Sequence, residues 1–240
     1  DGLEFKELRM PISNEADEMR SMLLEAIATA DDALMEKYFA GEEFAPEEII
    51  EGLKKGVASG EICPVFAGIQ QTGAAVPLMV DTLLKILPSA ADAVCRFEGG
   101  EEKAFDENGE NALFVFKTIA DPFVGKLSYF RVLSGKIKND SRLINNRTGA
   151  EERLSKIMWL KGGKQEDAGE IIAGDIGSVS KLGNVLTGDT LSASGKLAAA
   201  AVEFPAPTIS VAVYPKAKGD EEKITQAFSR LCEEDPTIKV

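Results

Sequence analysis

The chain has 240 residues, of which 44% are hydrophobic and 28% charged, enough apolar material to bury the core of one large domain or two ordinary ones. It has no histidine and only three widely spaced cysteines, which excludes histidine-based catalytic or metal centres and argues against a disulfide framework. No apolar stretch reaches the roughly 20 residues of a membrane span, and residues 1–10 do not resemble a secretory signal, so we expect a cytoplasmic protein with no membrane contact.

The net charge of −13 is unevenly distributed along the chain. Residues 1–60 hold 15 acidic and 6 basic side chains, a balance of −9, whereas residues 121–161 hold 9 basic and 4 acidic ones, a balance of +5. Salt screens charges beyond about 8 Å, so acidic helices at the start do not cancel a basic patch elsewhere. The acidic composition therefore does not exclude RNA as a binding partner. The acidic helices are either solvated or a docking surface for a basic protein.

Helical periodicity dominates the first 60 residues. Apolar positions in residues 14–39 predict one or two helices, with Ser13 or Asn14 as the N-cap. A further helix is predicted to open at Pro46, which is followed by two glutamates, and to end near Gly60.

A strand-loop-helix unit is expected next. The apolar run at residues 62–66 predicts a buried strand, and residues 74–87 predict a helix. The packed face of that helix is expected to hold Val76, Val80, Leu83, Leu84 and Leu87. The polar, glycine-bearing residues 98–110 are interpreted as a linker that runs into a hairpin, and as a domain boundary.

The pattern then changes to the period of two that is typical of strands. Alternation at residues 112–117 is followed by five β-rich runs, at residues 127–133, 142–145, 154–160, 171–176 and 178–182. Turn signals separate these runs at short intervals, which favours a small closed antiparallel barrel. After Pro205 and Pro207, a strand at residues 209–213 and a helix at residues 219–234 predict the opening of an α/β domain.

Six segments resemble elongation factor G, a translational GTPase. Four of them look like its second domain, a β-barrel: residues 116–127 (FKTIADPFVGKL), 130–135, 173–176 and 187–191. Two look like the opening of its third domain: residues 204–207 and 231–236. Residues 177–182 look closer to divergent factor-G-like paralogues than to the main translocase.

The resemblance implies a multidomain α/β fold and an internal fragment of a longer protein. Residues 1–97 would be the C-terminal part of a P-loop GTPase domain, including helices of an insertion. Residues 98–204 would be the antiparallel β-barrel, and residues 205–240 the start of a ferredoxin-like third domain.

The resemblance also places Gly68 and Ile69 in the last guanine-contacting loop. The family's loop continues Gly-Ser-Ala, whereas this chain has Gly-Ile-Gln and is shorter, so the alternative is that Gly68 only permits a tight turn. The sequence has no glycine loop ending in Lys-Ser or Lys-Thr and no Asn-Lys-x-Asp motif, and its Asp-x-x-Gly match at residues 106–109 lies in the linker. We expect GTP and Mg²⁺ to serve the intact protein, and this chain to bind neither and to hydrolyse no GTP alone.

Basic residues of the barrel region are the candidates for RNA binding, since lysine and arginine neutralise phosphates. The five that we single out are Lys126, Arg131, Lys136, Lys138 and Arg142, and three more are Arg147, Arg153 and Lys156. Alternation puts several of them on one outer face, and the resemblance implies that this face binds small-subunit ribosomal RNA. The alternative is an ordinary solvated strand face. Trp159 and Phe130 are expected in the core rather than stacked on bases.

The resemblance implies that the intact protein is a ribosome-dependent GTPase that promotes translocation during protein synthesis. We expect this chain to be monomeric and to have no DNA partner, and we assign it no catalytic or metal-binding residue. Two alternatives stay open. One is a ribosomal protection or recycling factor of the same class, and the other is a non-enzymatic ribosome- or RNA-binding adaptor, which the altered loop at Gly68 favours.

Overall fold

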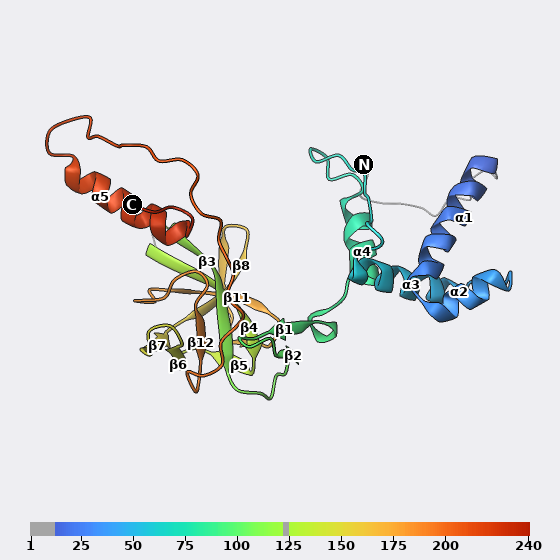
Figure 1. Cartoon of the computed structure of the whole chain (residues 1–240), viewed down its shortest axis with the longest axis horizontal. Helices are drawn as coiled ribbons and strands as arrows, with labels where there is room; N and C mark the ends of the chain where they lie inside the picture. Colours follow the sequence, from blue (N-terminus) through green and yellow to red (C-terminus); the bar gives the residue numbers. More distant parts are fainter. Residues whose placement is uncertain (1–12, 122–124) are drawn as a thin grey trace. The chain divides into compact units, whose positions relative to one another are not determined.

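The computed structural model describes residues 13–121 and 125–240, so part of the motif at residues 116–127 lies outside the described residues. The chain divides into two compact units, Asp1–Ser89 and Ala90–Val240. Helices make up the first unit, and most of the second is β-sheet (Figure 1). In the described ranges, no helix is long and apolar enough to cross a membrane.

Two capped helices open the first unit, as predicted. In front of α1 (Asn14–Thr29), the Ser13 hydroxyl accepts a hydrogen bond from the Ala16 N–H at 3.2 Å. Asp31 caps α2 (Asp32–Phe39) by accepting hydrogen bonds from two N–H groups of its first turn. These carboxylate and hydroxyl acceptors satisfy amides that a helix start otherwise leaves unpaired.

The third helix, α3 (Pro46–Ser59), begins at the predicted proline and ends at Gly60, which has a φ of 81°. Glu48 holds the first turn by accepting a hydrogen bond from the Ala45 N–H at 2.7 Å. On the inner face of α3, a Cβ on Gly52 would collide with Ile27 and Leu34. The glycine therefore lets α3 approach the first two helices closely.

The strand predicted at residues 62–66 does not form, and Val65 is 89% exposed. A buried strand needs backbone partners on a sheet, and no described segment supplies them here. The next helix, α4 (Val76–Ile86), forms as predicted, but its expected packed face is wrong. Ile86 is buried, whereas Leu84 is 78% exposed.

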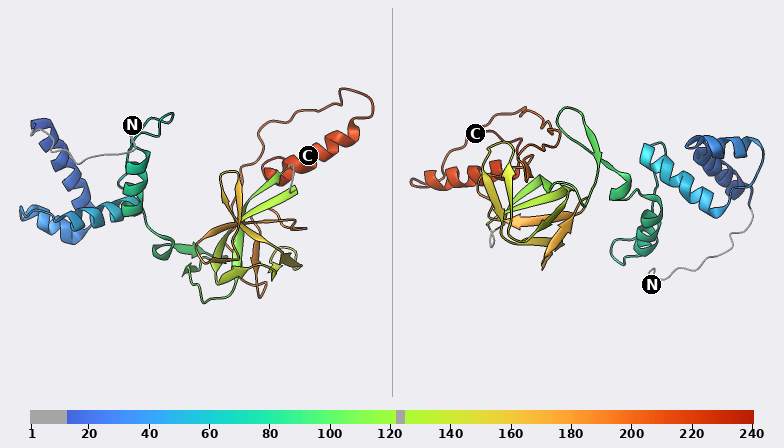
Figure 2. Two further views of the ribbon diagram at one scale, coloured as in Figure 1. Left: turned by 180° about the vertical axis from the view of Figure 1, so that it is seen from behind. Right: turned by 90° about the horizontal axis from the view of Figure 1, so that it is seen from below.

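The second unit is built on an eight-stranded antiparallel sheet in the order β7-β6-β12-β3-β4-β11-β8-β9. In chain order its strands are β3 (Ala112–Asp121), β4 (Gly125–Ser134), β6 (Ser141–Asn145), β7 (Glu151–Leu154), β8 (Ile157–Lys161), β9 (Lys164–Asp167), β11 (Ile176–Ser180) and β12 (Thr190–Ser192). Figure 2 shows these strands wrapping around a common interior, and we call them the curled sheet.

The curled sheet confirms the predicted antiparallel barrel architecture, but its ladder is open. Strands β7 and β9 are the two ends of the order, so among the described residues the backbone pairing does not run full circle. A short pair, β5 (Lys136–Lys138) with β10 (Glu170–Ile172), prolongs the β4 and β11 ladder beyond an irregular stretch. Hydrogen bonds from Val132 N–H to the Asp175 oxygen and from Ala173 N–H to the Gly135 oxygen bridge that stretch.

Apolar side chains from both sheet systems fill the interior. The buried core holds Leu113, Val115, Phe130, Val132, Ile137, Leu143, Leu154, Ile157, Ile171, Val179, Leu182, Val185 and Leu191. Burying one such side chain stabilises the fold by about 1.5–3 kcal/mol. Phe130 is fully buried and Trp159 packs partly against the core, as predicted for both aromatic residues.

The predicted linker is partly structured. After a short helical turn, η1 (Ala90–Asp92), strand β1 (Val94–Arg96) pairs with β2 (Glu102–Ala104) as a hairpin. Phe97 and Phe105 of this region join a second apolar cluster with Leu133 of the curled sheet. The hairpin therefore packs on the curled sheet instead of forming a free connection.

Beyond the curled sheet, the helix predicted near the end forms as α5 (Glu221–Glu234), but the strand at residues 209–213 does not. Ile209 is 81% exposed, because no described strand pairs with this segment. Helix α5 contacts β3, and the Glu234 carboxylate accepts a hydrogen bond from the Ala120 N–H at 2.6 Å.

Candidate nucleic-acid interface

Three of the five predicted RNA-binding residues lie near one another at one end of the curled sheet. Lys136 and Lys138 flank the buried Ile137 on β5, and Arg142 follows after a tight turn on β6. Each cation has a carboxylate partner: Glu107 at 3.0 Å, Glu170 at 3.1 Å and Glu151 at 2.8 Å, respectively. The hydrogen bond from Lys136 to Glu107 is the main cause that raises the pKa of Lys136, which therefore stays charged.

Arg131 lies in the middle of β4 and is held against the hairpin region. Its guanidinium carbon is 4.4 Å from the centre of the Phe105 ring, and its Nε donates to the Gly174 oxygen at 3.2 Å. A cation over a ring contributes about 0.5–2 kcal/mol, depending on how far it is desolvated. The contacts give Arg131 a structural role, and RNA binding by this residue stays a prediction.

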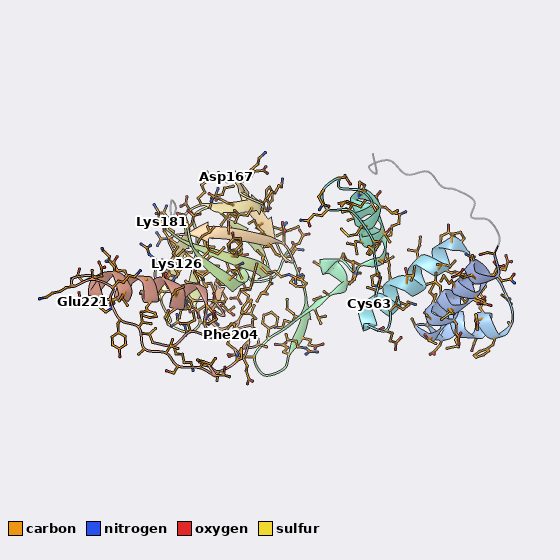
Figure 3. The ribbon with its side chains drawn as sticks, turned by 90° about the horizontal axis from the view of Figure 1, so that it is seen from above. Cys63, Lys126, Asp167, Lys181, Phe204 and Glu221 are labelled. Atoms are coloured by element: carbon orange, nitrogen blue, oxygen red, sulfur yellow. The ribbon has the colours of Figure 1, made fainter. Side chains whose placement is uncertain are left out.

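Lys126 lies near the start of β4, about 26 Å along the strand from its last residue, Ser134, at roughly 3.3 Å per residue, and Lys136 lies beyond that end on β5. Lys181 directly follows the neighbouring strand β11, and both lysines are labelled in Figure 3. The backbone N–H of Lys181 donates to the Lys126 oxygen at 3.0 Å, and the φ of Lys181 is 64°. Within the described ranges, neither lysine has a carboxylate in ion-pairing distance. We call Lys126 and Lys181 the lysine pair.

The structure therefore does not gather the five predicted residues into one patch. It separates a carboxylate-paired end from the lysine pair, because successive positions along one long strand lie far apart. Lys181 lies in the predicted β-rich run at residues 178–182 but was not among the RNA-binding candidates, and the structure places it just after the end of β11. Arg153 and Lys156 are paired as well, with Asp140 and Asp167.

Arg147 belongs to a buried network that the sequence did not indicate. Its Nε donates to Asp189 Oδ1 at 2.7 Å, and its Nη2 donates to Oδ2 at 2.9 Å. Asp189, only 6% exposed, also accepts hydrogen bonds from Asn145 and from the Leu186 N–H. Burial pushes the pKa of Asp189 up, but these hydrogen bonds outweigh it and leave the pKa lowered. Residues 187–191 therefore form a structural motif.

The predicted guanine-loop residues lie in a closed turn of the first unit. The Ile69 N–H donates to the Ala74 oxygen at 3.2 Å, and the Gly73 N–H donates to the Ile69 oxygen at 2.9 Å. A Cβ on Gly68 would lie 2.9 Å from the Ala74 oxygen, which by itself explains a glycine there. Guanine contact by Gly68 and Ile69 stays a prediction.

The described residues of this chain do not form a binding site for GTP and magnesium. The Ile69 amide is already used within the turn, and the sequence lacks a loop whose amides and lysine hold phosphates. Over the described ranges, no group of three or more cysteine, aspartate or glutamate side chains is arranged to hold a metal ion. A nucleotide would have to be held by other parts of an intact protein.

Two family models match the second unit in series. Residues 110–194 match "Elongation factor G domain 2", and residues 204–240 match "Elongation Factor G, domain III". The chain is also similar to a solved crystal structure from Thermus thermophilus, with a TM-score of 0.73 and 27% sequence identity over 96% of this chain. The chain spans 34% of the length of that structure. The domain 2 match covers the curled sheet and the domain III match covers α5, which identifies the chain as part of the elongation factor G-like family of translation factors.

Proposed function

We propose that this chain is the section of a ribosome-dependent GTPase through which the factor meets the small ribosomal subunit and promotes translocation. The observation that carries the proposal is the succession of a domain 2 and a domain III match in one chain, at residues 110–194 and 204–240. On this proposal, residues 1–97 belong to the GTPase domain, and GTP and Mg²⁺ bind outside the residues described here. The factor would act as a monomer in the cytoplasm.

The curled sheet would bind ribosomal RNA through its basic side chains. The lysine pair offers two cations with no competing carboxylate among the described residues. Lys136, Lys138 and Arg142 are paired, but exposed ion pairs stabilise a fold by only about 0–1 kcal/mol, so phosphates can replace the carboxylates at little cost. RNA phosphates attract such cations through long-range charge, independently of base sequence.

The contact between α5 and β3 would connect RNA binding with the third domain. Glu234 of α5 accepts the N–H of Ala120, which sits opposite Lys126 in the β3 and β4 ladder. A movement of α5 would thus act on the strand end that carries the lysine pair. This junction is a candidate for relaying the nucleotide state of an intact factor toward the ribosome.

Binding to purified ribosomal subunits tests the proposal. The chain is expected to cosediment with small subunits and less with large subunits, with an affinity that falls steeply as salt rises, since binding releases counterions. In a translocation assay driven by an intact elongation factor G, an excess of the chain should slow the reaction by occupying the small subunit. A factor-independent peptidyl-transfer assay serves as the control and should not change.

Equal affinity for both subunits, or an affinity that salt does not change, would contradict the proposal. Slowing of peptidyl transfer to the same extent would show that the chain disturbs ribosomes generally.

A further inference from the structure

A groove of about 600 Å³ lies on the curled sheet, and Arg131 stands opposite its lining residue Ile176 in the β4 and β11 ladder. It is lined by Tyr129, Trp159, Leu160, Lys161, Asp175, Ile176 and Gly177. Its wall is mostly apolar, and the two aromatic side chains are half-buried, so each ring keeps a surface toward the groove. Ile176 beside them is 50% exposed.

The groove exists because two neighbouring strands diverge. Strands β11 and β8 pair only at Ser178 with Met158 and at Val179 with Ile157, although each strand has five residues. Beyond these pairs the strands separate, and the groove opens between Gly177 and Trp159. Gly177 itself packs inward, where a Cβ would collide with Ile171 and lie 3.0 Å from Phe130.

Aromatic and basic side chains continue beyond the groove on strands β3 and β4. Tyr129 stands opposite Lys117 in the ladder, and its ring centre is 6.3 Å from that of Phe116, which is 39% exposed. Lys117 is exposed and has no ion pair within the described residues, whereas Lys161 pairs with Glu166 at 2.9 Å. The lysine pair begins three residues from Tyr129 along β4, so the alternation of a strand places the Lys126 side chain on the opposite face from Tyr129.

We propose that this groove holds an unpaired base of a single-stranded RNA segment, with Tyr129 and Trp159 as its stacking surfaces. The inference rests on the proposed function, since it names what part of the RNA the curled sheet takes. Stacking on aromatic rings is the common way in which proteins bind unpaired bases, and neighbouring cations hold the phosphates. Here Lys117, which stands opposite Tyr129 in the β3 and β4 ladder, supplies such a cation.

The charges favour RNA over a peptide as the occupant. The chain carries a net charge of −13, yet Lys117, the cation opposite Tyr129, is exposed and has no ion pair among the described residues. RNA alternates an apolar, planar base with an anionic phosphate, which matches an apolar groove with an unpaired lysine beside it. The Asp175 carboxylate at the groove rim is an acceptor for an exocyclic amino group, so an adenosine oligonucleotide is the suitable probe.

Trp159 is the single tryptophan of the chain, so its fluorescence reports on the groove directly. We expect a short single-stranded adenosine oligonucleotide to quench Trp159 emission and to protect it from iodide. A fluorescently labelled copy of the same oligonucleotide should give the same dissociation constant by anisotropy. A duplex that contains the same strand should leave the emission unchanged, because its bases are stacked inside the helix.

Substitution of Tyr129 gives the second readout. Tyr129→Leu removes the ring but keeps an apolar side chain, and it should weaken binding about tenfold, as expected for the loss of one stacked base. Tyr129→Phe keeps the ring and should bind as the unchanged chain does. Tyr214→Leu is the matched control, since Tyr214 is 82% exposed and lies outside the groove. If Tyr129→Leu does not fold, the quenching of Trp159 by the oligonucleotide and the affinity of Tyr129→Phe still test the proposal.

Three results would overturn the proposal. In the first, anisotropy shows that the oligonucleotide binds, but Trp159 emission does not change and Tyr129→Leu does not weaken the affinity. The RNA would then bind elsewhere on the chain. In the second, small subunits bind the chain but no oligonucleotide does. This result would rule out the groove as a base-binding site and would leave the proposed function unaffected. In the third, a polyglutamate peptide quenches Trp159 emission and the oligonucleotide does not, which would mean that the groove binds an acidic protein segment.

Discussion

Arg147 and Asp189 meet through two parallel hydrogen bonds of 2.7 and 2.9 Å, with Asp189 buried and Arg147 half-exposed. The pair connects the turn after β6 with the residue in front of β12. Since Asn145 and the Leu186 N–H also donate to the same carboxylate, one aspartate joins the turn at residues 145–147 to its own loop at residues 186–189. The positive charge of Arg147 is therefore used inside the fold.

Asp189→Asn should lower the free energy of unfolding by about 2 kcal/mol, because the amide cannot accept all four hydrogen bonds and leaves the guanidinium without its partner. Urea unfolding followed by circular dichroism measures the change. Asp140→Asn is the matched control: its ion pair with Arg153 is exposed on both sides, so the change should stay within about 0.5 kcal/mol. Equal effects of the two substitutions would contradict the structural role of Asp189.

The same carboxylate predicts a pH dependence. The pKa of Asp189 is lowered in the folded chain, so its contribution is present above the unfolded pKa of about 3.9 and is lost as the pH falls through the folded value. The stability difference between the unchanged chain and Asp189→Asn should thus be constant near neutral pH and shrink below about pH 4. A stability difference that grows as the pH falls would contradict the lowered pKa of Asp189. Urea titrations at several pH values give the answer.

Gly177→Ala should destabilise the curled sheet by about 1–3 kcal/mol, because the added methyl group enters a filled core next to Ile171 and Phe130. Gly163→Ala is the matched control, since nothing lies within 4 Å of a Cβ there. Thermal unfolding of the two variants should differ clearly, with only Gly177→Ala melting at a lower temperature. A normal melting temperature for Gly177→Ala would mean that the core is looser than the structure indicates.

The lysine pair should matter more for RNA than the paired cations do. Lys126→Gln or Lys181→Gln should each weaken small-subunit binding several-fold and reduce the slope of its salt dependence by about 1. Lys136→Gln should weaken it less, because Lys136 must first leave Glu107. Lys164→Gln, on the edge strand β9, is the control. The opposite order would place the RNA at the β5 and β6 end of the curled sheet.

Local signals predicted the helices well. The caps at Ser13, Pro46 and Gly60 act within one turn, so their effect does not depend on distant parts of the fold. The strands at residues 62–66 and 209–213 were wrong because a strand depends on partners that the sequence of the segment does not reveal. The short strands β1, β2, β5, β9 and β12 were missed, since three or four residues give too little alternation to detect.

The candidate site was harder to predict than the fold. Composition indicated that the region from Asp121 to Lys161 is basic, and this holds, but ion pairing depends on acidic residues as distant as Glu107 and Glu170. The partner of Lys126 is likewise Lys181, 55 positions later. The groove at Trp159 arises from strand divergence, which no periodicity encodes.

A cryo-electron microscopy reconstruction of small ribosomal subunits incubated with the chain would show whether the curled sheet contacts ribosomal RNA. We expect density for the curled sheet on the subunit, with Lys126 and Lys181 facing RNA phosphates. Density in which this edge of the sheet faces solvent, or in which only ribosomal protein contacts the chain, would contradict it.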